Sequence, residues 1–536
     1  MFTNKILPAL LSLFVLAGMT GCTDVGVNPK SQAGAEKVFA QEGAYKSYLA
    51  KLYGGLNVTG QEGPAGNPDI KQIDEGFSQY VRLWWQMQEL PTDEAVIAWN
   101  DGNVQELNTM TWSATNGFTS AMYSRIYFQV AHVNEFLRQS SQSKLDARDV
   151  GPEVRQKIPQ WRAEARFLRA LSYWHGIDLF GDIPLVKESF PRGGKAPPQA
   201  TRKEVFNYVE KELLAITNAK GEENLLPAGQ AQYGRVDKSA AWFLLAKLYQ
   251  NAPVYIGKKR SSEVIKYTTK ILDSGVYSLE PNYQDLFLAD NHTANGLIFS
   301  IPMDGQKTQH YGGTTFLAHA AVGGSLSPDT VGLGAGWAGL RTTRPTVQRY
   351  SSGDQRPVFP NTPDKQFYRQ GQSLAIQTLT DFTQGYAVPK YQNVTSTGEP
   401  GKNATFPDTD YPMFRLAEVH LMYAEAVLRG GGGSKSRAVS LINDLRERAF
   451  GDQSGNITKS ELTLDFILDE RSRELLWEAT RRTDLIRFGK FTGGEYVWPW
   501  KGDVQGGTST DEKFRLYPLP QSELLTNPNL EQNPGY

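Results

Sequence analysis

Several short motifs in this 536-residue chain partly match motifs that enzymes use. Gly334-Ala-Gly336-Trp-Ala-Gly339 has the spacing of a dinucleotide-binding loop, but no strand pattern precedes it and no acidic residue follows in a βαβ context. Gly430 to Ser436 (GGGGSKS) lacks the adjacent Gly-Lys of a phosphate-binding loop. The six histidines include no metalloprotease pair, and no Gly-x-Ser-x-Gly motif is present. We therefore interpret the first motif as an irregular loop, the second as a helix–helix turn and the histidines as ordinary core or surface residues.

Two pairs of adjacent carboxylates, Asp74-Glu75 and Asp93-Glu94, are candidates for glycosidic bond cleavage. That reaction needs two carboxyl groups that face each other across the bond. Adjacent residues on extended backbone point in opposite directions, so neither pair alone makes this arrangement. We expect no catalysis, although a pair formed by folding is left open as an alternative.

Alternating carboxylates in a loop form a third candidate site. Asp408 and Asp410 belong to the segment PDTD, and Asn403 is close in sequence. Oxygen ligands of this kind can hold calcium. A solvated turn is the competing interpretation, and both are kept.

The single cysteine, Cys22, follows a short apolar run. A run of this length is too short to span a bilayer and is typical of a secretion signal. The segment Leu16 to Cys22 (LAGMTGC) is similar to a bacterial lipobox. We expect residues 1–21 to be a lipoprotein signal peptide, Cys22 to be lipidated, and residues 22–37 to form a tether. A signal peptide cut elsewhere is the alternative.

The composition of the chain excludes several classes of function. Charge is balanced, with 56 Lys and Arg against 57 Asp and Glu, so nucleic acid is not an expected partner. Once Cys22 is lipidated no thiol remains for disulfides or metal ligation. Aromatic residues make up 11% of the chain, which suits a protein that presents rings to a ligand as well as burying them.

Helical periodicity supplies the elements that must position these residues. Thr201 followed by Glu204 forms a capping box at the start of one helix. Gly181 and Pro184 are expected to end the longest one. Helices are predicted over residues 117–138, 153–180, 201–217, 236–251, 261–274, 412–430, 435–450 and 464–488.

The helices pair at intervals typical of tetratricopeptide-like stacking, which predicts an all-α fold with loop-rich insertions. We expect one domain over residues 38–536. Its helical scaffold would comprise residues 38–57, 117–280 and 412–490, and its loop-rich ligand side residues 58–116 and 281–411. Long irregular stretches inside a compact protein are usually functional.

Three segments resemble the SusD/RagB family: residues 165–186 (ARFLRALSYWHGIDLFGDIPLV), residues 470–489 (ERSRELLWEATRRTDLIRFG) and the ending YPLPQSELLTNPNLEQNPGY. Ala479 stands where the family usually has glycine. Residues 57–67, 89–99, 308–315, 406–416 and 487–510 are similar to segments of a starch-binding member, and the likeness is weakest at about 350–385.

The resemblance implies a helical outer-membrane lipoprotein that faces the cell exterior, binds glycan and is not an enzyme. Such a protein covers a TonB-dependent, SusC-like transporter barrel and hands oligosaccharide to it. The expected ligand is starch or a maltooligosaccharide, an α-1,4-glucan. Another glycan, β-linked or branched, bound by the same scaffold is the alternative. A surface glycosidase and a purely structural lipoprotein are the remaining hypotheses.

The resemblance also implies a set of glycan-binding residues. The aromatic arc that stacks on sugar rings carries over to Trp99, Tyr311 and Trp337. Its polar partners carry over to Asp74 and Arg82, and either Asn100 or Asn103 serves beside the first ring. The PDTD segment matches a calcium-binding stretch, so the resemblance adds a structural calcium as the possible cofactor. By contrast, Trp84, Trp85, Trp174 and Trp242 are expected to pack in the core.

Sugar chemistry explains why rings would be placed in this way. A glucose ring has apolar C–H faces that stack on aromatic rings and polar edges that need hydrogen-bond partners. Because an α-1,4 linkage curves the chain, a curved row of rings contacts more sugars than a flat one. Stacking contacts and hydrogen bonds of about 1 kcal/mol each leave roughly micromolar to millimolar affinity after the cost of association.

Overall fold

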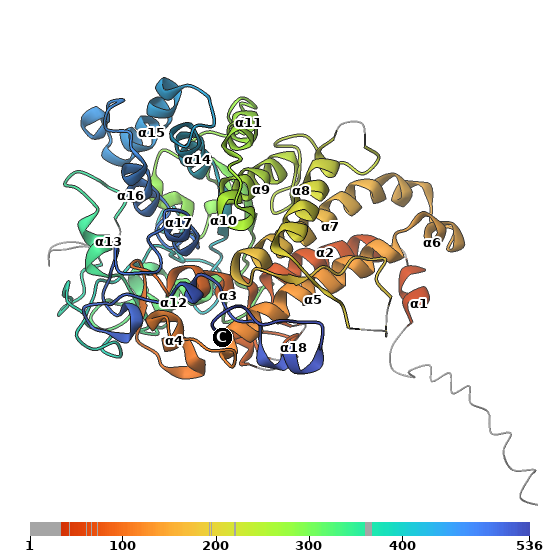
Figure 1. The fold of residues 1–536 in the computed structure, drawn as a ribbon, viewed down its shortest axis with the longest axis horizontal. Coiled ribbons are helices and arrows are strands. Elements are labelled where there is room, and N and C mark those ends of the chain that lie inside the picture. The colour runs from red at the N-terminus through yellow and green to blue at the C-terminus, as the bar shows by residue number, and fades with distance from the viewer. Residues whose placement is uncertain are drawn as a thin grey trace, which may run out of the picture.

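The computed structural model describes residues 34–536, apart from residues 42, 61, 66, 72, 192, 194, 195, 219, 220, 358 and 360–366. The expected signal peptide, Cys22 and most of the tether therefore lie outside the described residues. Helices dominate the structure, and its strands are short (Figure 1). Among the described residues, no helix combines the length and apolar character needed to cross a membrane.

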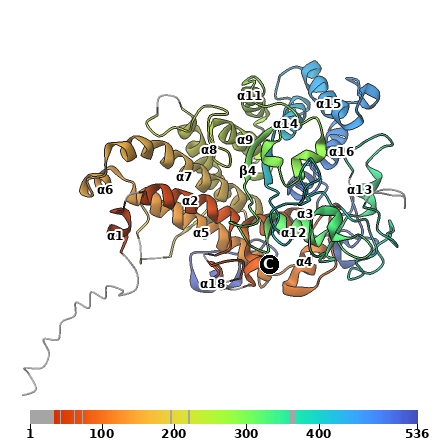
Figure 2. The same ribbon diagram turned by 180° about the vertical axis from the view of Figure 1, so that it is seen from behind.

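A series of helices packs neighbour against neighbour and forms the scaffold. Along the series α5 packs on α7, α7 on α8, α8 on α9, α9 on α11, α11 on α14 and α14 on α15. Figures 1 and 2 show this row extending across the upper part of the molecule, with α2 beside α5 and α7. Its members are α2 (Ala44–Asn57), α5 (Gly117–Gln139), α7 (Pro152–Leu179), α8 (Arg202–Thr217), α9 (Lys238–Gln250), α11 (Ser261–Leu272), α14 (Leu416–Leu428) and α15 (Lys435–Phe450).

The ends of these helices follow from local chemistry. Pro152 opens α7, and Gly181, with φ of 74°, follows its C-terminus. The side chains of Thr201 and Glu204 form the predicted capping box on α8. Residues 430–433 form the predicted turn between α14 and α15, with three of the four glycines at positive φ. The predicted all-α class and helix-pair scaffold are confirmed.

Two predicted helices differ in the structure. The 412–430 segment begins as a strand, β6 (Tyr411–Arg415), which pairs antiparallel with β4 (Leu297–Ile301) before α14 begins. The 464–488 segment forms two helices, α16 (Leu464–Glu474) and α17 (Arg481–Arg487). It breaks because Trp477 and Ala479 take left-handed backbone, with φ of 61° and 58°. The buried Trp477 indole donates a hydrogen bond to Glu94 O at 2.9 Å. This tertiary contact stabilises the interruption between the two helices.

The two loop-rich regions contain more regular structure than their composition indicates. The first holds α3 (Tyr80–Glu89), whose residues are all buried, together with β1 (Val96–Ile97) and α4 (Val104–Thr109). The second holds α12 (Gly313–Ala320) and β5 (Leu340–Arg341). β1 pairs antiparallel with β5, and this pairing joins the two regions. The remaining α-helices and strands are α1 (Ala35–Phe39), α6 (Gln142–Ala147), α10 (Ala252–Ile256), α13 (Arg344–Gln348), α18 (Gln521–Thr526), β2 (Ile183–Pro184) and β3 (Gln199–Ala200).

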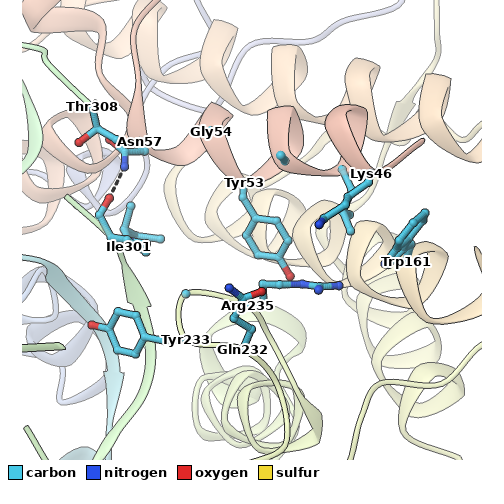
Figure 3. Close-up of a pocket in the computed structure, with 14 residues that line it drawn as sticks. Lys46, Tyr53, Gly54, Asn57, Trp161, Gln232, Tyr233, Arg235, Ile301 and Thr308 are labelled. Carbon is cyan, nitrogen blue, oxygen red and sulfur yellow. Dashed lines mark hydrogen bonds between the residues drawn. The ribbon is translucent and has the colours of Figure 1, made fainter. Parts of the chain in front are cut away.

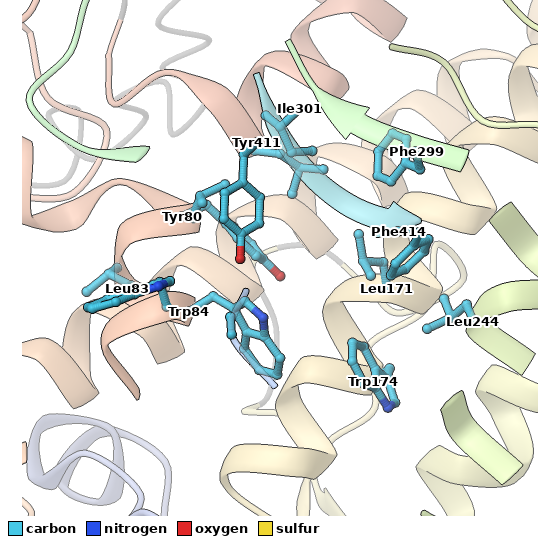
Figure 4. Close-up of a cluster of buried hydrophobic side chains, with 14 of the residues drawn as sticks. Tyr80, Leu83, Trp84, Leu171, Trp174, Leu244, Phe299, Ile301, Tyr411 and Phe414 are labelled. Atoms are coloured by element: carbon cyan, nitrogen blue, oxygen red, sulfur yellow. The ribbon is translucent and has the colours of Figure 1, made fainter. Parts of the chain in front are cut away.

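The core fills the space where α3, α7, α9 and the β4–β6 pair meet (Figure 4). Trp84 stacks on His175 with ring centroids 3.8 Å apart, and Trp174 lies beside both. The predicted core positions of Trp84, Trp85 and Trp174 are confirmed, because each is at most 3% exposed. Trp242 is only half-buried. This core holds α3 in place behind the candidate site.

Candidate functional site

Three aromatic rings from distant segments form a continuous row. Trp99 follows β1 and Trp337 precedes β5, so the pairing of these strands brings the two indoles together. Their centroids are 6.4 Å apart, and the Trp99 indole N–H donates to Trp337 O at 3.1 Å. The centroid of the Tyr311 ring lies 6.2 Å from that of Trp337, so Trp337 neighbours both other rings. Both indoles are half-buried and Tyr311 is 37% exposed, so the structure unites the three predicted rings at the surface.

Glycines make room for these rings. A Cβ at position 339 would lie 2.6 Å from the Trp99 indole, and one at position 336 would lie 2.6 Å from Val322 O. A Cβ at position 76 would lie 2.6 Å from Tyr311 Cβ. The Gly-x-Gly-x-x-Gly motif is the irregular loop that we predicted. Gly339 allows the backbone to approach the Trp99 ring, and Gly336 allows it to approach the backbone of Val322.

A histidine supports the central ring from behind. His319 stacks on Trp337 with centroids 4.5 Å apart and planes 18° from parallel. Its Nδ1 lies 2.6 Å from Ala335 O and its Nε2 lies 2.8 Å from Thr405 O. Burial lowers the pKa of His319, and the two carbonyl acceptors oppose that shift. One face of Trp337 is thus covered by His319.

Arg82 lies beneath the row and is almost sealed from solvent. It is 3% exposed, with its guanidinium carbon 4.4 Å from the Phe77 ring centroid and 4.2 Å from that of Phe316. Its Nη1 donates to Tyr311 O at 3.1 Å and to Gly76 O at 3.3 Å. Burial lowers the pKa of Arg82 to about 9. In this structure Arg82 fixes the backbone of Tyr311, and its predicted contact with sugar hydroxyls stays a prediction.

The other predicted polar partners are exposed. Asp74 accepts a hydrogen bond from Gly76 N at 3.0 Å through one carboxylate oxygen. Asn103 donates to Glu106 at 3.0 Å, whereas the Asn100 side chain makes no hydrogen bond with any described residue. Both asparagines are exposed, and the expectation that one of them serves beside Trp99 stays a prediction.

Four further side chains at the site carry no motif in the sequence. Phe77 and Phe316 enclose Arg82, His319 supports Trp337, and the Phe406 ring lies 5.4 Å from Tyr311. Phe316 and Phe406 come from segments far in sequence from Arg82 and Tyr311, the groups that they contact. Only the folded structure brings them together.

Asp408 and Asp410 are already satisfied by protein donors. Asp408 accepts from Gly305 N at 2.9 Å and Lys402 N at 2.7 Å. Asp410 accepts from Met303 N at 2.6 Å and from the Tyr233 hydroxyl at 2.5 Å. In the part of the chain that the structure describes, no three His, Cys, Asp or Glu side chains gather as a metal-binding group. Calcium fits poorly here because protein N–H and O–H groups already occupy these carboxylate oxygens. Calcium binding at Asp408 and Asp410 stays a prediction.

The paired carboxylates do not form a cleavage site at the surface. Asp93 and Glu94 are 0% and 1% exposed, and Arg481 Nε donates to Asp93 at 2.8 Å. Arg349 also pairs with Asp93, and these two arginines hold its pKa well below the usual range despite burial. Glu75 is buried and accepts from Thr59 at 3.0 Å, whereas its neighbour Asp74 is exposed. Neither adjacent pair presents two carboxyl groups to a common ligand.

A stack of helix pairs that carries a half-exposed row of aromatic rings is the arrangement expected of a helical carbohydrate-binding protein. The model of the SusD family matches residues 356–536, and a second model, described as starch-binding associating with the outer membrane, matches residues 81–250. Starch-binding protein SusD from Bacteroides thetaiotaomicron is 34% identical, over 100% of this chain and 99% of that protein. SusD-like protein P2 from Formosa agariphila is 26% identical, with 98% of each chain covered. The chain belongs to the SusD/RagB family of glycan-binding proteins.

Solved structures show the same fold. A SusD homologue from Bacteroides thetaiotaomicron has a TM-score of 0.71 at 20% identity, covering 94% of this chain and 98% of that one. Surface glycan-binding protein A from the same organism, in complex with laminarihexaose, has a TM-score of 0.67 at 21% identity, covering 92% and 99%.

Proposed function

We propose that this protein captures starch and its α-1,4-linked oligosaccharides at the cell surface. The observation that carries this proposal is the tilt along the row of rings. The Trp99 and Trp337 planes differ by 46°, and the Trp337 and Tyr311 planes differ by 51°. Because each ring is tilted relative to the next, the row is not flat, and a curved glucan can place successive sugar faces on successive rings.

The polar groups around the row suit a neutral sugar. Asp74 and Asn100 are exposed beside the rings and offer acceptors and donors to hydroxyl groups. Arg82 is 3% exposed beneath the rings, and its contact with sugar hydroxyls is part of this proposal. Three stacking contacts and a few hydrogen bonds give modest affinity, roughly micromolar to millimolar. Such affinity suits a receptor that releases its ligand.

The site is proposed to bind without catalysis and without a required cofactor. A glycosidase needs two facing carboxyl groups, and both adjacent pairs considered in the sequence lack that arrangement. Incubation of the protein with starch, followed by an assay of new reducing ends, should yield none. Accumulation of reducing ends by the wild type that is lost in Trp337→Ala would contradict this part of the proposal.

The proposed location and partner follow from the lipobox and the family. Lipidation of Cys22 would anchor the chain in the outer membrane, facing the exterior. From there it would deliver oligosaccharide to a TonB-dependent, SusC-like transporter. The family model described as associating with the outer membrane supports this location. Cys22→Ser should release the protein from membranes, which fractionation followed by blotting will measure.

A second candidate ligand is a β-linked glucan. A protein of the same fold, at a TM-score of 0.67, was solved with laminarihexaose. Affinity electrophoresis through gels that contain amylopectin, β-glucan or xylan separates the two candidates. Retardation by amylopectin supports the proposed ligand, whereas retardation only by β-glucan or xylan would replace it.

A further inference from the structure

A cavity of about 350 Å³ lies between α2, α7 and the end of β4 (Figure 3). Tyr53 descends from α2 into it, and Trp161 of α7 contributes a second ring. Tyr233 adds a third ring and is 43% exposed, which is unusual for a large aromatic side chain. The volume of the cavity is at the small end of the range of about 300–1,000 Å³ for small-molecule sites.

The walls of this cavity are held rigid by paired groups. The Tyr53 hydroxyl donates to Glu164 at 2.7 Å, and the Arg235 guanidinium donates to the same carboxylate at 2.9 Å. The Tyr233 hydroxyl donates to Asp410 at 2.5 Å. The charge of Arg235 is thereby neutralised by Glu164. Two of the three rings are therefore fixed by their hydroxyl groups and need no reordering to receive a ligand.

The rim supplies polar groups that the protein itself does not use. Lys46 and Gln232 are exposed, and neither side chain hydrogen bonds to any described residue. Apolar ring walls with a few available polar groups match the two surfaces of a sugar, whose faces are apolar and whose edges carry hydroxyls. Of the two charged side chains among the described lining residues, Arg235 is paired with Glu164, which leaves the Lys46 ammonium at the rim. With a single available charge, we expect the ligand to be neutral.

The cavity and the aromatic row are built on one segment. Pro302 and Thr308 line the cavity, and Tyr311 belongs to the row. Asn57 of α2 donates to Pro302 O and its side-chain oxygen lies 3.0 Å from His310 Nε2, so it ties this segment to the scaffold. Three residues of extended chain reach at most about 10 Å, so Thr308 and Tyr311 are close neighbours.

We propose that this cavity is a second carbohydrate subsite, which takes one or two glucose units at the end or branch of a chain whose neighbouring part lies on the aromatic row. This inference rests on the proposed function. It predicts that long α-glucans bind more tightly than short ones, because only they reach both sites.

Gly54 allows the cavity to be filled without unfolding the protein. It lines the cavity within α2, and a Cβ added there meets only Val58 Cγ2, at 3.9 Å. Leucine and alanine both favour a helix more than glycine does, so neither variant should lose structure. Gly54→Leu places a branched side chain in the cavity, and Gly54→Ala is the matched control.

Titration calorimetry with maltotriose and with maltoheptaose tests the subsite. We expect Gly54→Leu to weaken maltoheptaose binding about fivefold while maltotriose affinity is unchanged. Gly54→Ala should bind both ligands as the wild type does, and Gln232→Ala should weaken maltoheptaose binding only. Wild-type affinity of Gly54→Leu for both ligands would overturn the subsite. Loss of transporter association in Gly54→Leu with glucan binding intact would overturn it too.

Failure of the proposed function gives a different result. If Trp337→Ala binds both ligands as the wild type does, the aromatic row is not the main site. The response of Gly54→Leu is measured independently of that outcome.

Discussion

The imidazole of His319 lies nearly parallel to the indole of Trp337, with centroids 4.5 Å apart. It also contacts Ala335 O and Thr405 O, which belong to two loops distant in sequence. The central ring of the row is therefore held from behind and offers one face to a ligand.

Removal of this support should weaken glycan binding. His319→Ala leaves a gap behind Trp337 and unties the two loops, so we expect a three- to tenfold loss of affinity for maltoheptaose, or about 1 kcal/mol. Stability should fall by about 1–3 kcal/mol because a buried ring is lost. Titration calorimetry and thermal unfolding measure the two effects.

His420 provides the matched control for that variant. It is 5% exposed and contacts Leu441 O at 3.0 Å, between α14 and α15. His420→Ala should destabilise the fold yet bind maltoheptaose normally. Equal loss of binding in both variants would show that His319 acts only through general stability.

Alanine substitution at two glycines of one motif should affect glycan binding differently. At position 339 a Cβ would lie 2.6 Å from the Trp99 indole, so Gly339→Ala must displace that ring and reduce binding at least tenfold. At position 334 a Cβ would lie 3.4 Å from Ala404 Cβ, a tolerable contact, so Gly334→Ala should bind normally. Calorimetry on the two variants checks this, and normal binding by Gly339→Ala would mean that the Trp99 position is unimportant.

Buried Glu94 should make stability depend on pH. Burial raises the pKa of Glu94 to about 7, with Asp93 adding to the shift and Arg481 opposing it. The folded protein thus holds a proton that the unfolded chain releases near its ordinary pKa of 4.5. The resulting stability is complete below that value and is lost as pH rises through about 7.

Glu94→Gln removes this titration. Relative to the wild type, the variant should gain roughly 1–3 kcal/mol of stability between pH 5 and pH 8. Thermal unfolding at both pH values measures the difference. Glu495→Gln, at an exposed position, is the control and should track the wild type. A pH-independent difference between Glu94→Gln and the wild type would contradict the raised pKa.

Much of the scaffold was predictable because its signals are local. The capping box at Thr201 and the stop at Gly181 involve residues within one turn of the helix end. The helix break at Trp477 was not predictable, because its left-handed backbone is stabilised by a hydrogen bond to Glu94, nearly 400 residues away in sequence. Helix α3 was missed because it is buried on every side and its residues include polar ones that find distant partners, such as Gln88 with Asp178.

The candidate site also contains residues that were predictable from the sequence and residues that were not. Trp99, Tyr311 and Trp337 were predicted through resemblance to the family, and the structure brings them together. The supporting contacts of His319 and Phe406 depend on the packing of separate loops, and no motif in the sequence marks them.

The central claim is that a curved row of rings recognises curved α-1,4-glucan. Its most direct test is calorimetric titration of α-cyclodextrin and maltohexaose, which have the same number of glucose units, into the wild type and Trp337→Ala. We predict that the wild type binds both and binds the cyclic ligand more tightly, whereas Trp337→Ala binds neither. No heat from either ligand with the wild type, or unchanged affinity in Trp337→Ala, would contradict the account.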